Sequence, residues 1–161
     1  MMSLALRNGC EAPDEVGALF SEYTELLIAG DPAFQAYLEL QNYAGELVHL
    51  EEKYSRPAGR LYLADWDGAL AGCVALRRLD DARCEMKRLY VRPEFRGRHI
   101  ARALTERILE DAREIGYRAM VLDTLPFLDG AVRLYEKLGF YRIDGYNDNP
   151  MENAVYMQKV L

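Results

Sequence analysis

An arginine-rich segment, residues 83–107, holds the side chains of this sequence that are best suited to binding an anion. It contains eight basic and three acidic residues, so its net charge is +5, while the whole chain carries −6 and the remainder −11. Within it, Arg96-Gly97-Arg98 comes directly before an amphipathic helical pattern that starts at Ile100. A helix N-terminus offers free N–H groups and the positive end of the helix dipole. This arrangement predicts a phosphate-binding loop, and the alternative is a solvated helix face with ordinary ion pairs.

Several other kinds of site lack the residues that they require. His49 and His99 form no zinc-protease pattern, and the cysteines, Cys10, Cys73 and Cys84, form no closely spaced pair, so we expect no metal site. No nucleophile elbow, nucleotide phosphate loop or dinucleotide fingerprint occurs in the sequence. Three widely spaced cysteines suit a reducing cytoplasm, where buried and inert thiols are the usual state.

The composition indicates a folded domain with a sizeable core. Hydrophobic residues make up 50% of the 161 residues and charged residues 29%, and we expect residues 1–161 to form one domain. Acidic residues outnumber lysines and arginines 26 to 20, which argues against nucleic acid as a partner. The sequence contains no basic leader and no apolar run of about 18 residues, so we expect a cytoplasmic protein without a membrane partner.

Hydrophobic periodicity predicts the helices and strands that must position the loop at Arg96-Gly97-Arg98. A helix is expected from an N-cap at Asp14 to Gly30, and a second helical pattern starts at Asp31-Pro32. Strands are expected at 4–8, 60–66, 69–78, 83–91, 119–124, 140–143 and 154–160, and further helices at 100–115 and 129–138. This order predicts an α+β fold with a mixed, mostly antiparallel sheet, a central parallel strand pair and helices on both faces.

Two stretches of the sequence share a pattern with a known family. The first, residues 85–101, reads EMKRLYVRPEFRGRHIA, and the second, residues 134–140, reads LYEKLGF. Together they resemble the GNAT acetyltransferase superfamily, whose pyrophosphate loop follows the pattern Gln/Arg-x-x-Gly-x-Gly/Ala. Arg96 and Ala101 match this pattern, whereas His99 stands where the family has glycine. The resemblance covers residues 60–161 and implies a GNAT-like fold; the N-terminal helices agree in their order.

The resemblance also implies acetyl-CoA as the cosubstrate, without a metal. It would lie in a V-shaped opening between the strand that ends at Val91 and the strand at 119–124. In the family, backbone groups equivalent to those of Leu89 and Val91 pair with pantetheine, and an N–H near Leu89 or Tyr90 stabilises the oxyanion. The residues implied for the pyrophosphate are Arg96, Gly97, Arg98, His99, Ile100 and Ala101. Leu128 stands where some members have an asparagine that contacts pantetheine, so that contact is missing.

Two residues are implied as catalytic. Tyr135 matches the tyrosine that protonates the departing thiolate, and a phenol with a pKa of about 10 is able to do so. The alternative is a core tyrosine at helical spacing with Val132 and Leu138. Glu85 is the candidate base, which an alkylammonium with a pKa of about 10.4 requires. Alternatively, Glu85 forms an ion pair with Arg83, Lys87 or another basic residue of the arginine-rich segment.

The acceptor is expected at the carboxyl end of the strand at 119–124. Asp123 and Thr124 lie there, and the polar loop 144–150, which includes Asn147, could line the same pocket or form an Asx-rich turn. The function implied is transfer of an acetyl group to a primary amine of a small molecule or peptide, by direct attack in a ternary complex.

The acidic remainder of the chain favours a cationic acceptor through electrostatic steering. One alternative function is a GNAT-fold acyl-CoA sensor or interaction module without turnover. The other is a nucleic-acid binder that uses the arginine-rich segment. The negative net charge of the chain disfavours this second alternative. A homodimer is compatible with the sequence.

Overall fold

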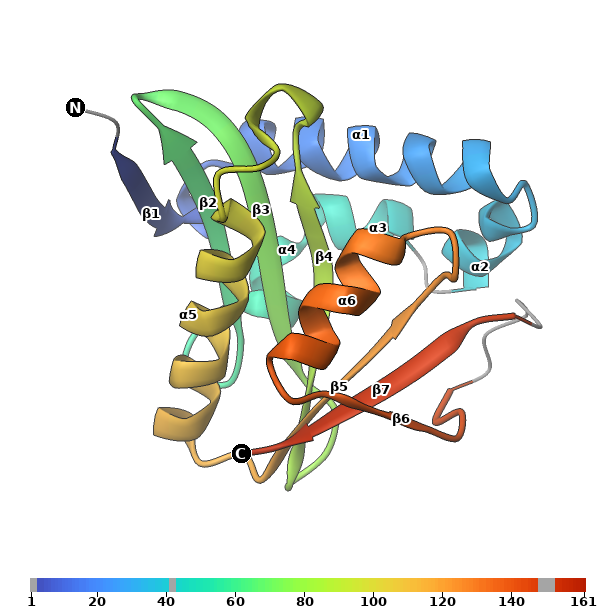
Figure 1. Cartoon of the computed structure of the whole chain (residues 1–161). Helices are drawn as coiled ribbons and strands as arrows, with labels where there is room; N and C mark the ends of the chain where they lie inside the picture. Colours follow the sequence, from blue (N-terminus) through green and yellow to red (C-terminus); the bar gives the residue numbers. More distant parts are fainter. Residues whose placement is uncertain (1–2, 41–42, 148–152) are drawn as a thin grey trace.

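The computed structural model describes residues 3–40, 43–147 and 153–161, and its centre is a seven-stranded sheet. The strands lie in the order β1-β2-β3-β4-β5-β7-β6 (Figure 1). Their bounds are β1 Leu4–Asn8, β2 Arg60–Trp66, β3 Ala69–Arg78, β4 Arg83–Val91, β5 Ala119–Thr124, β6 Tyr141–Ile143 and β7 Val155–Val160. β4 and β5 pair in parallel, and the other neighbouring strands pair antiparallel. The predicted mixed sheet with a central parallel pair is therefore confirmed.

Local turn chemistry explains the antiparallel first half of the sheet. β2 and β3 are joined at Asp67 and Gly68, whose φ values are 50° and 83°. Two consecutive residues with positive φ make the tight turn whose twist suits a hairpin. β4 ends before Pro93, which cannot donate to a strand ladder, and a short 3-10 helix, Pro93–Phe95, follows.

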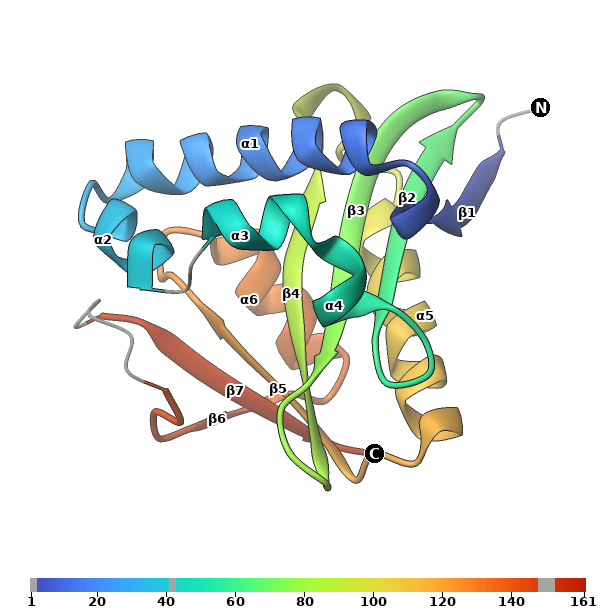
Figure 2. The ribbon, with the colours of Figure 1, turned by 180° about the vertical axis from the view of Figure 1, so that it is seen from behind.

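Helices cover both faces of the sheet, as the sequence predicts. α1 Pro13–Gly30, α2 Phe34–Leu40, α3 Tyr43–Val48 and α4 Leu50–Tyr54 lie on one face (Figure 2). α5 Ile100–Ile115 and α6 Asp129–Lys137 lie on the other face (Figure 1). None of the helices in the described ranges is long and apolar enough to span a bilayer.

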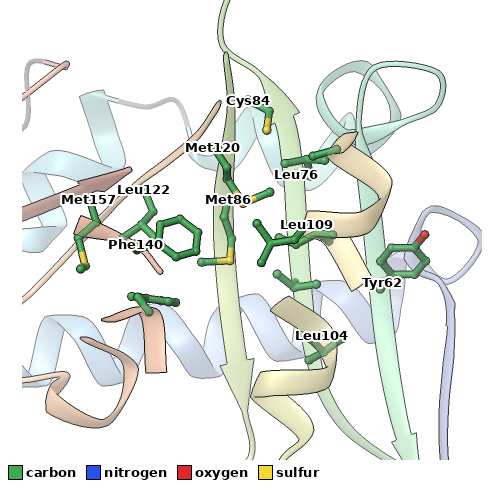
Figure 3. Packing of buried hydrophobic residues seen from close by; sticks show 14 of the residues in the cluster. Tyr62, Leu76, Cys84, Met86, Leu104, Leu109, Met120, Leu122, Phe140 and Met157 are labelled. Atoms are coloured by element: carbon green, nitrogen blue, oxygen red, sulfur yellow. The ribbon is translucent and has the colours of Figure 1, made fainter. Parts of the chain in front are cut away.

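The larger core lies between the sheet and the helices α5 and α6 (Figure 3). α5 places Leu104 and Ile108 on one stripe, one turn apart, and both side chains are fully buried. They pack with strand residues that include Met86, Met120 and Leu122. Truncating a leucine in such a core costs about 2–5 kcal/mol of stability, so this layer holds β4 and α5 in a fixed relation.

A second core joins α1 and α4 to the opposite face. Leu19, Phe20 and Tyr54 are fully buried there against Leu63 of β2. Cys73 and Cys84 are buried on the strands, and burial raises the pKa of both thiols to about 12. Their predicted burial is confirmed.

The N-terminal helices differ from the sequence prediction. α1 has its N-cap at Ala12 and Pro13 in its first turn, so the predicted N-cap at Asp14 is wrong; Asp14 instead lies in the first turn, where its charge suits the helix dipole. α2 starts at Phe34, after Asp31 Oδ1 accepts a hydrogen bond from the N–H of Ala33. α3 and α4 were not predicted, because helices of six and five residues are too short to show a period.

Candidate active site

The parallel strands β4 and β5 separate at the centre of the sheet. They pair from Arg83–Ala119 to Glu85–Val121, and beyond these residues the two strands diverge (Figure 1). β4 also contains a bulge: Ala75 pairs with Lys87 and Cys73 with Tyr90, so three residue steps on β4 oppose two on β3. Arg88 lies in this bulge with a φ of 59°. The structure therefore contains the V-shaped opening that the resemblance implied.

The loop from β4 to α5 has a left-handed backbone conformation at two positions. Gly97 and His99 have φ values of 82° and 59°, and α5 begins at Ile100. His99 thus adopts the left-handed conformation that glycine favours, although it bears a side chain. In the described structure, no side chain caps the N-terminus of α5. The first amides of this helix therefore lie at an uncapped, positively polarised end.

The two arginines of the loop are exposed and differ in their surroundings. Arg98 lies over the rings of Trp66 and Phe95, at 5.6 and 5.5 Å from their centroids, and donates to the carbonyl oxygen of Glu94 at 3.0 Å. Arg96 lies on the wall of a groove. We name it the cofactor groove, after the role proposed for it below. It lies between the end of β4 and α6, and its walls include Leu89, Tyr90, Val91, Ala101, Gly130, Ala131, Leu134 and Tyr135.

Tyr135 lies where the cofactor groove meets a second pocket, because it lines both. Its side chain is buried, and its ring is 5.7 Å from that of Phe140. Burial raises the pKa of the Tyr135 phenol above its ordinary value. The hydroxyl therefore stays protonated at neutral pH, which a proton donor requires.

The second pocket lies between the sheet and the first two helices, and we call it the acceptor pocket after the role proposed for it below. It is lined by residues of α1, α2, β4 and β5 together with Leu125, Leu128 and Tyr135. Asp123 and Thr124 are among the lining residues, at the carboxyl end of β5, where the sequence predicted them. Tyr23 and Leu27 of α1 form the opposite wall.

A hydrogen-bond network surrounds Asp123. The hydroxyl of Tyr37 donates to Asp123 Oδ2 at 2.5 Å, and Nδ2 of Asn147 donates to the same oxygen at 3.1 Å. Tyr156 in turn donates to Oδ1 of Asn147 at 3.1 Å. Burial and the nearby carboxylate raise the pKa of the Tyr37 phenol. The structure thus brings Asp123 and Asn147 together, and it adds Tyr37 and Tyr156, which sequence reasoning missed.

Glu85 precedes the pocket-lining residue Met86 on β4 and forms an ion pair. Its side chain is 1% exposed; Arg77 Nε donates to Oε1 at 2.6 Å and the Tyr146 hydroxyl to Oε2 at 2.5 Å. Arg77 is directly opposite Glu85 in the β3–β4 ladder. An ion pair was the alternative for Glu85, but the partner comes from outside the arginine-rich segment, and Arg83 pairs with Asp80 instead. Loop residues 148–150 lie outside the described residues.

The bulge of β4 is supported by a buried ion network. Arg88 Nε and Nη2 donate to the two carboxylate oxygens of Glu46 at 2.9 and 3.3 Å, and Lys53 Nζ donates to Oε1 at 2.6 Å. The guanidinium also lies over the rings of Tyr43 and Phe20. Burial alone would raise the pKa of Glu46, but Arg88 and Lys53 outweigh it and lower the pKa to about 2.

The neighbouring Lys87 also lines the acceptor pocket. Burial lowers the pKa of its ammonium to about 7, and the charge of Arg88 acts in the same direction. The sequence offered one signal for this site, the adjacent charged residues Lys87 and Arg88 in the middle of the strand expected at 83–91. Among the described residues, no group of three or more His, Cys, Asp or Glu side chains could hold a metal ion.

Comparison with known proteins establishes the class of this fold and site. Residues 21–140 match the family model described as the Acetyltransferase (GNAT) family. This match covers most of the chain, and it agrees with the split parallel strands and the loop before α5. The chain belongs to the GNAT family and is an acyltransferase.

Three similar proteins extend the comparison. An uncharacterised N-acetyltransferase of Schizosaccharomyces pombe is 40% identical over 90% of this chain and 86% of its own length. The N-acetylaspartate synthetase of Danio rerio is 37% identical over 69% of this chain, but the match spans 43% of that protein. The PaiA N-acetyltransferase of Thermoplasma acidophilum, solved with coenzyme A, has the same fold, with a TM-score of 0.75, 18% identity and 99% of each chain covered.

Proposed function

We propose that this protein is an acetyl-CoA-dependent N-acetyltransferase acting on a primary amine of a small molecule or peptide by direct attack in a ternary complex. Tyr135 carries the proposal, because its side chain borders both the cofactor groove and the acceptor pocket. A proton donor for the leaving thiolate must lie at such a junction. We treat residues 1–161 as one functional domain.

The cofactor groove suits a pantetheine arm that ends in a pyrophosphate. Its walls are largely apolar along β4 and α6, and Arg96 lies at the end next to the α5 N-terminus. A Cβ added at Gly130, which lines the groove, would meet no neighbouring atom within 4 Å, so space remains at this wall. When bound, acetyl-CoA would supply an activated acetyl thioester.

The chain's own residues then have distinct proposed tasks. The amides of residues 97–101 and the side chains of Arg96 and Arg98 hold the phosphates. The backbone of Leu89, Tyr90 and Val91, which follows the bulge, aligns the thioester arm and offers an N–H to the developing oxyanion. Tyr135 gives its proton to the thiolate.

The acceptor's proton has two proposed destinations. Asp123 lines the pocket directly. Glu85 reaches it only if Tyr146 moves aside or a water molecule relays the proton, because Arg77 and Tyr146 occupy its carboxylate. Glu85→Gln separates a base from a purely structural role by its kinetics. Both roles predict a lower free energy of unfolding, because Arg77 loses its carboxylate partner. Only a base also predicts that the folded variant has a lower kcat for every acceptor, whereas a purely structural role predicts that its kcat is kept.

Tyr135→Phe tests the proposal against a binding module without turnover. The wild-type protein should release free CoA from acetyl-CoA with at least one member of a panel of amino acids, polyamines, aminoglycosides and peptide N-termini. The panel includes aspartate because of the name of the Danio rerio relative. The variant should lose roughly 100-fold or more in kcat while it binds acetyl-CoA normally, since a missing general acid typically costs that much.

Tyr141→Phe is the matched control, because Tyr141 is exposed on β6. Acetyl-CoA binding without CoA release for any amine would favour the sensor or interaction module instead.

A further inference from the structure

The acceptor pocket carries opposite charges on the two strands that separate to form it. Lys87 and Arg88 line it from β4, and Asp123 lines it from β5. Much of the remaining wall is apolar or aromatic, including Leu27, Phe34, Leu122, Leu125 and Leu128. Charged groups that line a pocket with such walls attract a charged ligand strongly, because little water screens the interaction.

The bulge is the reason that β4 contributes two cations in a row. In a regular strand, successive side chains point to opposite faces. At Arg88, φ is 59° and the ladder gains a residue, so the alternation is broken and Lys87 and Arg88 both border the pocket. Glu46 binds the Arg88 guanidinium through two hydrogen bonds. The Arg88 side chain is buried, whereas Lys87 is only partly buried, so Lys87 is the more exposed cation on this wall.

The acidic wall is held in a defined orientation. Tyr37 and Asn147 both donate to Oδ2 of Asp123, at 2.5 and 3.1 Å. These donors come from α2 and from the loop after β6, so two separate parts of the chain fix this carboxylate. A pocket with a positioned anion on one strand and a cation on the other suits a ligand that carries both charges.

We propose that the acceptor is an amine that also carries a carboxylate, such as an α-amino acid, with its carboxylate bound by Lys87 and its amino group by Asp123. This inference rests on the proposed acetyltransferase function and narrows its substrate class. It differs from the cationic acceptor that the net charge of the chain favours, because contacts inside the pocket decide binding, whereas the net charge acts at a distance.

The electrostatic surroundings of Lys87 agree with this assignment. Its ammonium is influenced by Arg88, Glu85, Lys53 and Asp123, and burial together with Arg88 lowers its pKa to about 7. A carboxylate bound next to Lys87 would favour the charged ammonium and raise this pKa again. Hydrogen bonds between two charged groups are the strongest type available in such a pocket.

Matched acceptor pairs test the inference. The pairs are L-leucine with 3-methylbutylamine, L-phenylalanine with 2-phenylethylamine, and L-aspartate with its diamide, each assayed by CoA release. The carboxylated member should have the higher kcat/KM, by roughly 10- to 100-fold for at least one pair, as expected for one charged hydrogen bond. Lys87→Met should remove this difference by raising the KM of the carboxylated member alone, and Lys87→Arg should keep part of it.

Two further measurements complete the test. Lys137→Met, at the exposed end of α6, is the control and should leave the preference intact. 3-Phenylpropionate, which has the carboxylate but no amine, should compete with the acceptor in the wild type and not in Lys87→Met.

Equal or better use of the decarboxylated amines and the diamide would overturn the inference and leave the acetyltransferase function standing. An equal loss of kcat for the carboxylated and the uncarboxylated acceptor in Lys87→Met would also overturn the inference. It would indicate that Lys87 acts as a base or supports the structure. If no acceptor released CoA, the proposed function would fail and this inference with it.

Discussion

The two halves of the site are built in different ways. The cofactor half, Leu89–Ala101 with α6, comes largely from one continuous stretch, and Arg96 and Arg98 in it are exposed. The acceptor half joins residues far apart in the chain: Tyr37 binds Asp123 across 86 positions, Glu85 binds Tyr146 across 61, and Arg88 binds Glu46 across 42. Glu46, Glu85 and Arg88 are buried charges in this half. Changes in the cofactor half should therefore alter the affinity for one ligand, while changes in the acceptor half should also alter the stability of the fold.

The largest effect is expected for Glu46→Gln. This change leaves the Arg88 guanidinium buried without its carboxylate partner, which typically costs about 3–5 kcal/mol. Urea unfolding at pH 7 measures the loss. Glu52→Gln is the control, since Glu52 is 73% exposed, and it should change the free energy of unfolding by less than about 0.5 kcal/mol. Similar stability of both variants would mean that the ion pair does not hold the acceptor half together.

The same pair predicts an acid-dependent loss of stability. In the folded chain, the pKa of Glu46 is lowered from 4.5 to about 2. The unfolded state therefore binds this proton first as the pH falls, so the contribution of Glu46 is complete above about pH 4.5 and disappears towards pH 2. Unfolding curves over this range should show a smaller pH dependence for Glu46→Gln than for the wild type. The same pH dependence in both proteins would contradict the assignment of this acid-dependent stability to Glu46.

A moderate effect is expected for Tyr37→Phe, which removes one donor from Asp123 and keeps the ring in place. Hydrogen bonds to a charged group contribute about 1.5–3 kcal/mol, and Asn147 remains as a second donor. We expect the KM of the acceptor to rise roughly 5- to 30-fold, with the KM of acetyl-CoA unchanged. Steady-state kinetics with each substrate varied in turn measure the two KM values. Equal increases in the KM of the acceptor and the KM of acetyl-CoA would remove the distinction between the two halves of the site.

A smaller and opposite pattern is expected for Arg96→Gln. Because Arg96 is exposed on the cofactor groove, its contribution is screened and amounts to about 1 kcal/mol. The KM of acetyl-CoA should rise about fivefold at low salt and less at high salt, while the KM of the acceptor stays constant. Arg113→Gln, on the exposed surface near the other end of α5, should change neither.

The smallest effect is expected for His99→Gly. His99 has a left-handed φ of 59°, which costs a residue with a side chain about 1 kcal/mol, but glycine loses more entropy on folding. The net gain in the free energy of unfolding should be about 0.5 kcal/mol, with little change in the KM of acetyl-CoA. A clear destabilisation would mean that the imidazole of His99 makes a contact that the loop requires.

Much of the cofactor half could be predicted because its signals are local. Gly97 and the helix pattern from Ile100 stand next to each other in the sequence, and Tyr135 lies in a short motif on a single helix. The hairpin strands followed in the same way from the Asp67-Gly68 turn. The acceptor half gave weaker signals. Helices α3 and α4 are too short to show a hydrophobic period, and nothing in the sequence near Asp123 indicates that it accepts a hydrogen bond from Tyr37.

The sequence by itself determined the succession of the strands along the chain, the turn residues, the loop before α5 and the helix that carries Tyr135. Each of these depends on neighbours within a few positions, where backbone sterics and hydrophobic period act. The tertiary structure alone decided that Glu85 faces Arg77, that Glu46 neutralises Arg88, and that Lys87 and Asp123 line one pocket. These pairs depend on strand register, on the bulge in β4 and on helix packing, which bring distant residues together only when the whole sheet has formed.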